Sequence, residues 1–140
     1  MIKVATSNDF IEINNRRKIY LNTPDLTEIP IEEKTICVFD DASNDFLLAE
    51  LADLGEKTPQ SNPFWVVQCF TASLGNIRPI IKEFALELQR RNYTNTSIFW
   101  PPQKNLLREA AVKNLLAPRE KFINNRKFWE YTASETLAKI

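Results

Sequence analysis

The chain has 140 residues, which is enough for one compact domain with its own hydrophobic core and too few for two domains of ordinary size. Hydrophobic residues make up 44% and charged residues 26%, as in most globular proteins, and the formal net charge is zero. The sequence contains no histidine, which excludes a histidine base, histidine zinc ligands and Ser-His or Cys-His catalytic pairs, and we expect no metal site.

The first ten residues and the apolar segments indicate where in the cell the protein is expected. Residues 1–10 lack the apolar segment of a secretory signal, and the longest apolar runs are too short to cross a bilayer. We therefore expect a cytoplasmic protein with no membrane partner. Cys37 and Cys69 both lie among apolar neighbours, where a cysteine is usually a small buried hydrophobe.

Charge is distributed unevenly along the chain. Residues 1–62 carry 6 Lys or Arg and 12 Asp or Glu, a net charge of −6, whereas residues 78–127 carry 11 and 4, a net charge of +7. Such asymmetry can mark a surface that faces a polyanion. Two solvated faces of opposite charge explain it as well, and we favour this second interpretation.

The first elements follow from local patterns. Residues 2–5 predict a short strand, and residues 6–9 supply an N-cap and early negative charge for a helix that follows. Residues 20–33, with two prolines, predict an irregular connection. Residues 35–39 are rich in β-branched and aromatic side chains and predict a strand.

The segment 46–54 is ambiguous. Its Leu, Ala and Glu residues favour helix, and its leucines fit helical spacing. Leu47, Ala49 and Leu51 would equally form one face of a strand that makes a hairpin with residues 35–39. The pattern alone leaves both alternatives open. Residues 55–63 are polar and predict a loop.

The stretch 64–91 carries the main functional signal. An apolar strand at 64–70 leads through a small-residue loop at 71–75 into a long amphipathic helix that begins at Asn76. Such a turn leaves backbone N–H groups unpaired at the helix start, and with the helix dipole they can bind an anion. The turn is either an anion site or a simple connection. Gly75 is one of two glycines, and we expect its backbone geometry to matter.

The last third predicts a strand at 96–100, a second amphipathic helix at 104–115, and closing strands at 121–123 and 127–132 around an Asn-Asn turn. In the helix we expect four residues to face inward: Leu107, Ala110, Ala111 and Leu115. Three tryptophans fall on predicted strands and are expected in the core: Trp65, Trp100 and Trp129. The order of elements predicts an α/β fold with a mixed sheet, in which strands 64–70 and 96–100 form a right-handed parallel pair.

This order of strand, helix, hairpin, strand, helix, strand, helix and closing hairpin resembles the GNAT family of N-acetyltransferases across nearly the whole chain. Residues 2–10 resemble the first strand and helix entry of that family, and residues 105–115 resemble its last helix. The resemblance is closest to short members encoded by short-tailed phages, some of which are internal virion proteins. It implies one GNAT-like domain over 1–140, a parallel strand pair that splays apart, a strand at 46–54, and a location in the host cytoplasm or the virion.

The resemblance also implies a site in the cleft between the splayed strands, with acetyl-CoA as cofactor. Asn105 would contact the cofactor arm, and Arg78, Lys104 and Arg108 are nearby cations able to screen phosphate charge. The backbone groups that would hold the pyrophosphate are those of Leu74, Gly75, Asn76 and Ile77.

Some positions depart from the family pattern. The phosphate loop of the family has Gln or Arg, two residues, Gly, one residue, then Gly or Ala. With Gly75 aligned, this chain has Ala72 and Ile77 at the outer positions, so one position of three matches. Ala111 and Val112 occupy the region where a tyrosine often protonates the leaving thiolate.

Acyl transfer to an amine requires a base. Glu50 is the candidate, with Asp53 as the other carboxylate on that predicted strand, and Tyr131 is the candidate proton donor. The alternatives are a solvated carboxylate at Glu50 and a strand aromatic at Tyr131.

The sequence is compatible with three different functions. The first is an N-acyltransferase that uses a CoA thioester and an unidentified amine, with an intact or a degenerate site. The second is a non-catalytic GNAT-fold structural or binding protein such as a phage virion component. The third, nucleic-acid binding by the basic half, ranks last because that half has no recognisable reader motif.

Overall fold

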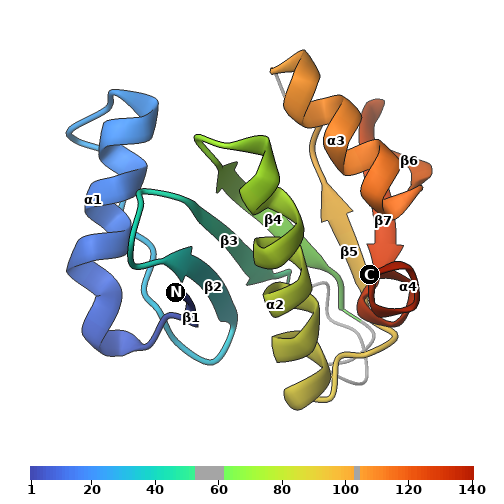
Figure 1. Ribbon diagram of the computed structural model, residues 1–140, viewed down its shortest axis with the longest axis horizontal. Coiled ribbons are helices and arrows are strands. Elements are labelled where there is room, and N and C mark those ends of the chain that lie inside the picture. The colour runs from blue at the N-terminus through green and yellow to red at the C-terminus, as the bar shows by residue number, and fades with distance from the viewer. Residues whose placement is uncertain (53–61, 103–104) are drawn as a thin grey trace.

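The computed structural model describes residues 1–52, 62–102 and 105–140 (Figure 1). Within these residues seven strands form one sheet: β1 Ile2–Val4, β2 Thr35–Asp40, β3 Phe46–Leu51, β4 Phe64–Phe70, β5 Ser97–Trp100, β6 Arg119–Ile123 and β7 Arg126–Thr132. The helices are α1 Phe10–Leu21, α2 Ile77–Arg90, α3 Leu106–Leu116 and α4 Ala133–Lys139, with short 3-10 turns η1 Ser7–Asp9 and η3 Leu74–Asn76.

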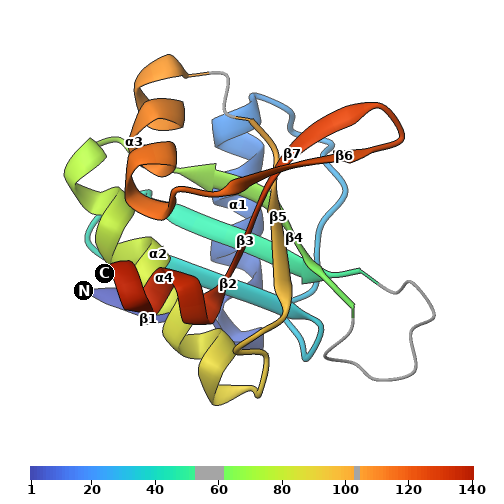
Figure 2. The ribbon, with the colours of Figure 1, turned by 90° about the vertical axis from the view of Figure 1, so that its right-hand side faces the viewer.

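The strand order is β1-β2-β3-β4-β5-β7-β6, and all neighbours are antiparallel except β4 and β5, which are parallel. Helix α1 covers one face of the sheet, and α2, α3 and α4 cover the other (Figure 2). The predicted α/β fold with a mixed sheet and a parallel central pair is therefore confirmed. No helix in the described part of the chain is long and apolar enough to span a membrane.

Segment 46–51 is a strand. It pairs antiparallel with β2, with Val38 opposite Leu47 and Cys37 opposite Leu48. Leu47 and Leu48 are both fully buried, one in each of the two cores on either side of the sheet. A strand that is covered on both faces has apolar residues at adjacent positions instead of alternate ones. The leucines of this segment therefore did not show strand alternation and fitted the spacing of a helix as well. Asp53 and Gly55 lie outside the described residues.

The cysteines lie in opposite cores. Cys37 packs on the α1 face and Cys69 on the α2 face, and both are buried free thiols. Burial raises the pKa of both, that of Cys69 to about 12, so neither is an activated nucleophile. The prediction that both are buried hydrophobes is confirmed.

The tryptophans lie on strands, as predicted. Trp100 and Trp129 are buried, and Trp65 is half-buried with its ring centroid 5.1 Å from that of Phe99 and 4.9 Å from that of Phe128. All three therefore pack against other core side chains.

The predicted inner face of α3 is wrong in part. Its buried residues are Arg108, Val112 and Leu116, whereas Leu107 is 69% exposed and Ala110 is exposed. Ala111 and Leu115 lie at the edge of the core. The buried face of α3 is therefore shifted by one residue from the predicted face. The reason is that Arg108 points inward, although a hydrophobic pattern assigns an arginine to solvent.

Helix α4 was not predicted, although its start carries a recognisable signal. Thr132 Oγ1 accepts from the backbone N–H of Glu135, and Glu135 accepts from the N–H of Thr132, both at 3.1 Å, which is a capping box. The predicted turn before β7 is confirmed, because Asn124 and Asn125 have φ values of 50° and 65°, as a tight hairpin turn requires.

Strands β4 and β5 separate soon after they meet. They pair at Phe64 with Ile98 and at Trp65 with Phe99, after which β4 continues to Phe70 and β5 ends at Trp100. The register between β3 and β4 also shifts next to this point, between Leu48 and Ala49, which leaves Val67 as an extra residue on β4. The splayed end of β4 leads directly into the loop before α2.

Candidate functional site

The loop after β4 uses its own backbone to close the start of α2. Ser73 Oγ accepts from the N–H of Gly75 at 3.3 Å, and the carbonyl oxygen of Ser73 accepts from the N–H of Asn76 at 3.1 Å. The N–H of Ile77 donates to the carbonyl of Leu74, and the Ile77 side chain is buried. Three of the four residues predicted to bind pyrophosphate thus have their N–H groups bonded within the loop, and Leu74 is 48% exposed.

A carboxylate lies against this loop. Asp45, which is 2% exposed, accepts from the N–H of Ala72 at 2.8 Å through Oδ1 and from the side-chain amide of Asn76 at 2.7 Å through Oδ2. The same amide donates to Asp40 at 3.1 Å. Two carboxylates from the turn between β2 and β3 therefore bind where an incoming anion would approach.

Asp40 is firmly ionised. Hydrogen bonds from the N–H of Ala42 and from the N-terminal ammonium lower its pKa to about 2. Arg16 Nη1 donates to the carbonyl oxygens of Asp40 and Asp45, each at 3.0 Å, and holds the turn in place. The Asp40 carboxylate beside the loop is therefore ionised at neutral pH, with the N-terminal ammonium as its counter-ion.

The cations predicted to screen phosphate charge do not gather at the loop before α2. Arg78 is exposed and donates to the carbonyl oxygen of Ile140 at 3.3 Å, whereas Lys104 lies outside the described residues. Asn105 is the N-cap of α3, and its Oδ1 accepts from the N–H of Arg108 at 3.0 Å. The visible role of Asn105 is to cap this helix.

Arg108 reaches from α3 to the end of β4. Its Nη2 donates to the carbonyl of Thr71 at 2.9 Å, its Nη1 to the hydroxyl of Tyr20 on α1 at 3.4 Å, and its guanidinium lies 5.5 Å from the centroid of the Phe70 ring. Only 8% of the residue is exposed. Side chains of the protein thus occupy the splayed end of β4.

The two candidate catalytic residues lie on opposite faces of the sheet. Glu50 is half-buried and follows Leu48 on the α1 face, near enough to Arg17 to oppose the lowering of the Arg17 pKa by burial. Tyr131 is 1% exposed on the α2 face, where burial raises the pKa of its hydroxyl well above the usual value. The structure does not bring them together.

Several buried polar atoms near the splayed strands have no hydrogen-bond partner. Gln68 Nε2, Thr71 Oγ1 and Arg108 Nε lie along or beside the end of β4, and Trp100 Nε1 and the Tyr131 hydroxyl lie on the α2 face. Such groups are costly to bury and are rare in folded proteins. They make this part of the sheet more polar than its hydrophobic sequence suggests.

Sequence reasoning also missed two buried arginines on α1, Arg16 and Arg17. Arg17 donates through Nε to Gln68 Oε1, and through Nη1 to Asn14 Oδ1 at 2.9 Å and to the carbonyl of Thr27 at 3.0 Å. Burial lowers its pKa. A charged pair at 16–17 within a helix reads as solvent-exposed, and no local signal marks either residue as buried.

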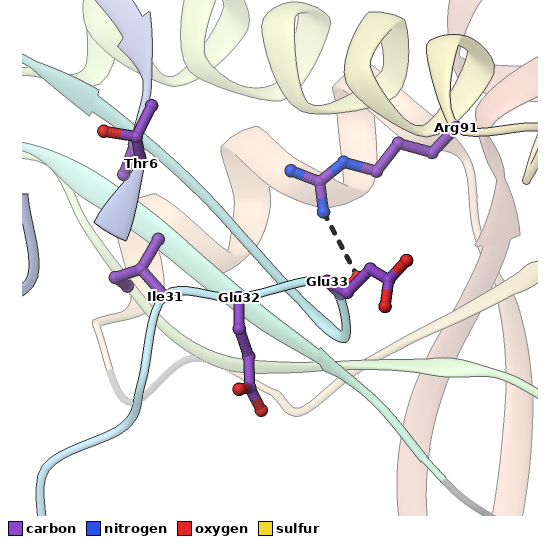
Figure 3. A pocket seen from close by; sticks show the side chains of 6 residues that line it. Thr6, Ile31, Glu32, Glu33 and Arg91 are labelled. Atoms are coloured by element: carbon purple, nitrogen blue, oxygen red, sulfur yellow. Dashed lines mark hydrogen bonds between the residues drawn. The ribbon is translucent and has the colours of Figure 1, made fainter. Parts of the chain in front are cut away.

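The described residues also line surface hollows. One of about 430 Å³ is lined by Ala5, Thr6, Ile31, Glu32, Glu33 and Arg91. Figure 3 shows Arg91 donating to the backbone carbonyl of Glu33, and the same guanidinium also donates to the Glu87 carboxylate and to the carbonyl of Thr35. Others lie at 92–96 and beside Tyr20. None of these includes residues 74–78. Within the described residues no group of three or more His, Cys, Asp or Glu could hold a metal ion.

Comparison with known proteins adds evidence about the fold. No protein-family profile and no curated protein matches the chain. A crystal structure of a domain from Methanocaldococcus jannaschii DSM 2661 is similar, with a TM-score of 0.51 and 11% sequence identity, over 94% of this chain and 97% of that one. At this identity the likeness concerns the fold alone.

Proposed function

We propose that this chain is a GNAT-like domain that acts as a non-catalytic binding or structural protein, with the virion role of its phage-encoded counterparts as the model. The observation that carries the proposal is the position of Asp45. The Asp45 carboxylate accepts hydrogen bonds from the N–H of Ala72 and from the side-chain amide of Asn76. These donors lie at the loop where a CoA pyrophosphate would have to bind.

A phosphate would compete with Asp45 at a cost. To bind this loop it would displace a buried carboxylate from two donors, or lie beside two carboxylates of like charge. A hydrogen bond to a charged group contributes about 1.5–3 kcal/mol, so the loss of either donor by Asp45 would be costly. Further support comes from Asn105 and Arg108, which are engaged in the fold, and from Glu50 and Tyr131, which lie on opposite faces.

Calorimetric titration with acetyl-CoA and desulfo-CoA tests the proposal. We expect neither heat nor a thermal shift up to millimolar ligand for the wild-type protein. Asp45→Asn removes one negative charge and keeps the amide acceptor, and any latent affinity of the loop would emerge in this variant. Micromolar binding of acetyl-CoA by the wild type, lost in Gly75→Val, would refute the proposal.

Acyl transfer is the second candidate, and the separation of β4 from β5 beyond Trp65 favours it. On this alternative, Glu50 serves as base and Tyr131 becomes accessible when the strands open. Release of free thiol from acetyl-CoA in the presence of polyamines, slowed at least tenfold by Glu50→Gln, would support the transferase.

A further inference from the structure

The hairpin of β6 and β7 projects from the body of the molecule, as Figure 2 shows, and its far end carries charge of one sign. We call residues 121–127 the hairpin tip. It contains three cations and no carboxylate, and Lys121, Arg126 and Lys127 are all exposed. In the described part of the chain the ion pairs of this hairpin lie below the tip, where Arg119 binds Glu130 and Glu135. The tip cations are therefore available to a partner.

The strand register joins these residues into one surface. Phe122, which is 64% exposed, lies directly opposite Lys127 on one face of the hairpin. Residues directly opposite each other in an antiparallel pair have neighbouring side chains. Lys121 and Arg126 share the other face, because their partners in the register are residues 128 and 123. The tip thus presents an exposed aromatic ring beside one cation, with two further cations behind it.

The base of the hairpin holds the tip cations in position. Phe128 and Trp129 are buried. The Arg126 guanidinium lies 5.8 Å from the centroid of the Phe128 ring, and Lys127 Nζ lies 4.5 Å from the centroid of the Trp129 ring. A cation over a ring keeps its N–H groups for another acceptor, so these contacts orient the charges without neutralising them.

Protection of a sheet edge does not account for this charge. Strand β6 is the last strand of the sheet, and natural proteins often place lysines on an edge strand to prevent pairing with another chain. Arg126 and Lys127, however, lie on β7, which is the inner strand of the pair. The exposed Phe122 on the edge strand also works against such protection.

We propose that the hairpin tip binds single-stranded nucleic acid, RNA or DNA, with Phe122 stacked on a base and the three cations on backbone phosphates. Proteins commonly hold unpaired strands with aromatic rings beside cations, because every base has a face to stack and every nucleotide a charge. This inference rests on the proposed binding function and names its site and partner. Nucleic-acid binding ranked last on the sequence for want of a reader motif, whereas the fold brings a ring and three cations together at one place.

The apex of the hairpin and the number of its charges favour this partner over a membrane. Asn124 and Asn125 form the turn, so their amides would have to enter the lipid ahead of Phe122. The same amides can donate and accept hydrogen bonds with bases or phosphates. Recognition of anionic lipid commonly takes about four to eight cations, and the tip has three.

Fluorescence anisotropy with labelled twenty-nucleotide oligo(dT) and oligo(U) on the full-length chain tests the inference. We expect binding that weakens with salt, with a slope of log affinity against log salt of about −2, as three phosphate contacts with a single strand predict. Lys121→Gln, Arg126→Gln and Lys127→Gln should each reduce the magnitude of this slope by about 0.7. Lys82→Gln, which changes an exposed cation on α2, is the matched control and should leave the slope unchanged.

The aromatic ring has a test of its own. Phe122→Ala and Phe122→Leu should each weaken binding at least about fivefold at an unchanged salt slope, because leucine keeps apolar surface but cannot stack. Phe122→Trp should retain binding. Ile11→Ala is the control, because Ile11 is 73% exposed on α1, and it should have no effect. Glu120→Gln removes an exposed carboxylate next to the tip and should tighten binding.

Other outcomes would overturn the inference. These are no salt-sensitive binding of either oligonucleotide at about 100 μM protein, affinity that the tip substitutions do not change, or equal affinity for polyglutamate, which has charge but no bases. Duplex DNA bound as tightly as the single strand, with no effect of Phe122→Ala, would do the same. Binding to phosphatidylserine vesicles in place of oligonucleotide, retained in Phe122→Leu, would assign the tip to a membrane. Binding of acetyl-CoA would refute the proposed function, whereas absence of oligonucleotide binding would refute this inference alone.

Discussion

At the scale of single residues, the side chains that define the candidate site are held by the fold itself. Asp45 closes the loop after β4, Asn105 caps α3, and Arg108 spans from α3 to α1. Each residue type suits ligand binding in isolation, and each has a structural partner here. Gly75 is different, because the fold does not need a glycine at this position. A Cβ added to Gly75 would meet only Ser73 Oγ, at 3.5 Å, and the φ angle of Gly75 lies outside the left-handed region. The backbone of Gly75 therefore does not require glycine, which goes against the expectation that its geometry matters.

Gly75→Ala should stabilise the protein. Alanine fits the native backbone and reduces the entropy of the unfolded chain, so we expect a gain of about 0.4–1 kcal/mol in the free energy of unfolding. Urea denaturation followed by circular dichroism measures it. Ser73→Ala, which removes the acceptor of the Gly75 N–H, should instead lose about 1 kcal/mol. A destabilised Gly75→Ala protein would show that the loop needs glycine after all.

At the scale of elements, helix ends decide where segments begin and which face they bury. Helix α3 begins at Asn105 and turns Arg108, Val112 and Leu116 inward. Helix α4 begins at the capping box of Thr132 and Glu135, and Arg119 of β6 binds the Glu135 carboxylate at 2.6 and 2.9 Å. The closing hairpin and the last helix are therefore joined through one carboxylate.

Thr132→Ala should loosen α4. The variant leaves the N–H of Glu135 without its side-chain acceptor, and we expect a loss of about 1 kcal/mol in the free energy of unfolding. Ser134→Ala is the matched control, because Ser134 is exposed in the same first turn. Hydrogen exchange of the α4 amides should rise in Thr132→Ala and stay unchanged in Ser134→Ala; equal exchange in both would rule out the cap as the anchor of this helix.

At the scale of the whole molecule, the strands β2 and β3 are buried on both faces and separate two cores. Asp40 ties the end of β2 to the N-terminus and to Asn76 before α2. Its pKa of about 2 lies below the ordinary value of about 3.9. Because the folded-state pKa is the lower one, the stabilisation is complete above about pH 4 and is lost as the pH falls toward 2.

Stability should therefore fall with acid in a way that depends on Asp40. Asp40→Asn keeps an oxygen acceptor and removes the titration, so we expect a shallower loss of thermal stability between about pH 4 and 2 than in the wild type. Asp25→Asn, an exposed carboxylate in the connection after α1, is the control and should leave the profile unchanged. Parallel acid profiles for Asp40→Asn and the wild type would contradict this role for Asp40.

The amino-acid sequence by itself determined the α/β class, the order of most elements, the parallel pairing of β4 with β5, and the burial of Cys37 and Cys69. These follow from periodicity, caps and turn residues, which act over a few positions. Only the tertiary structure decided that 46–51 is a strand, that Arg17 and Arg108 are buried, and that Asp45 lies against the loop before α2. The hydrogen bonds of Arg17 with Gln68, of Arg108 with Thr71 and of Asp45 with Ala72 join residues 27 to 51 positions apart, and in sequence a buried charge looks the same as a solvated one until its partner is placed beside it.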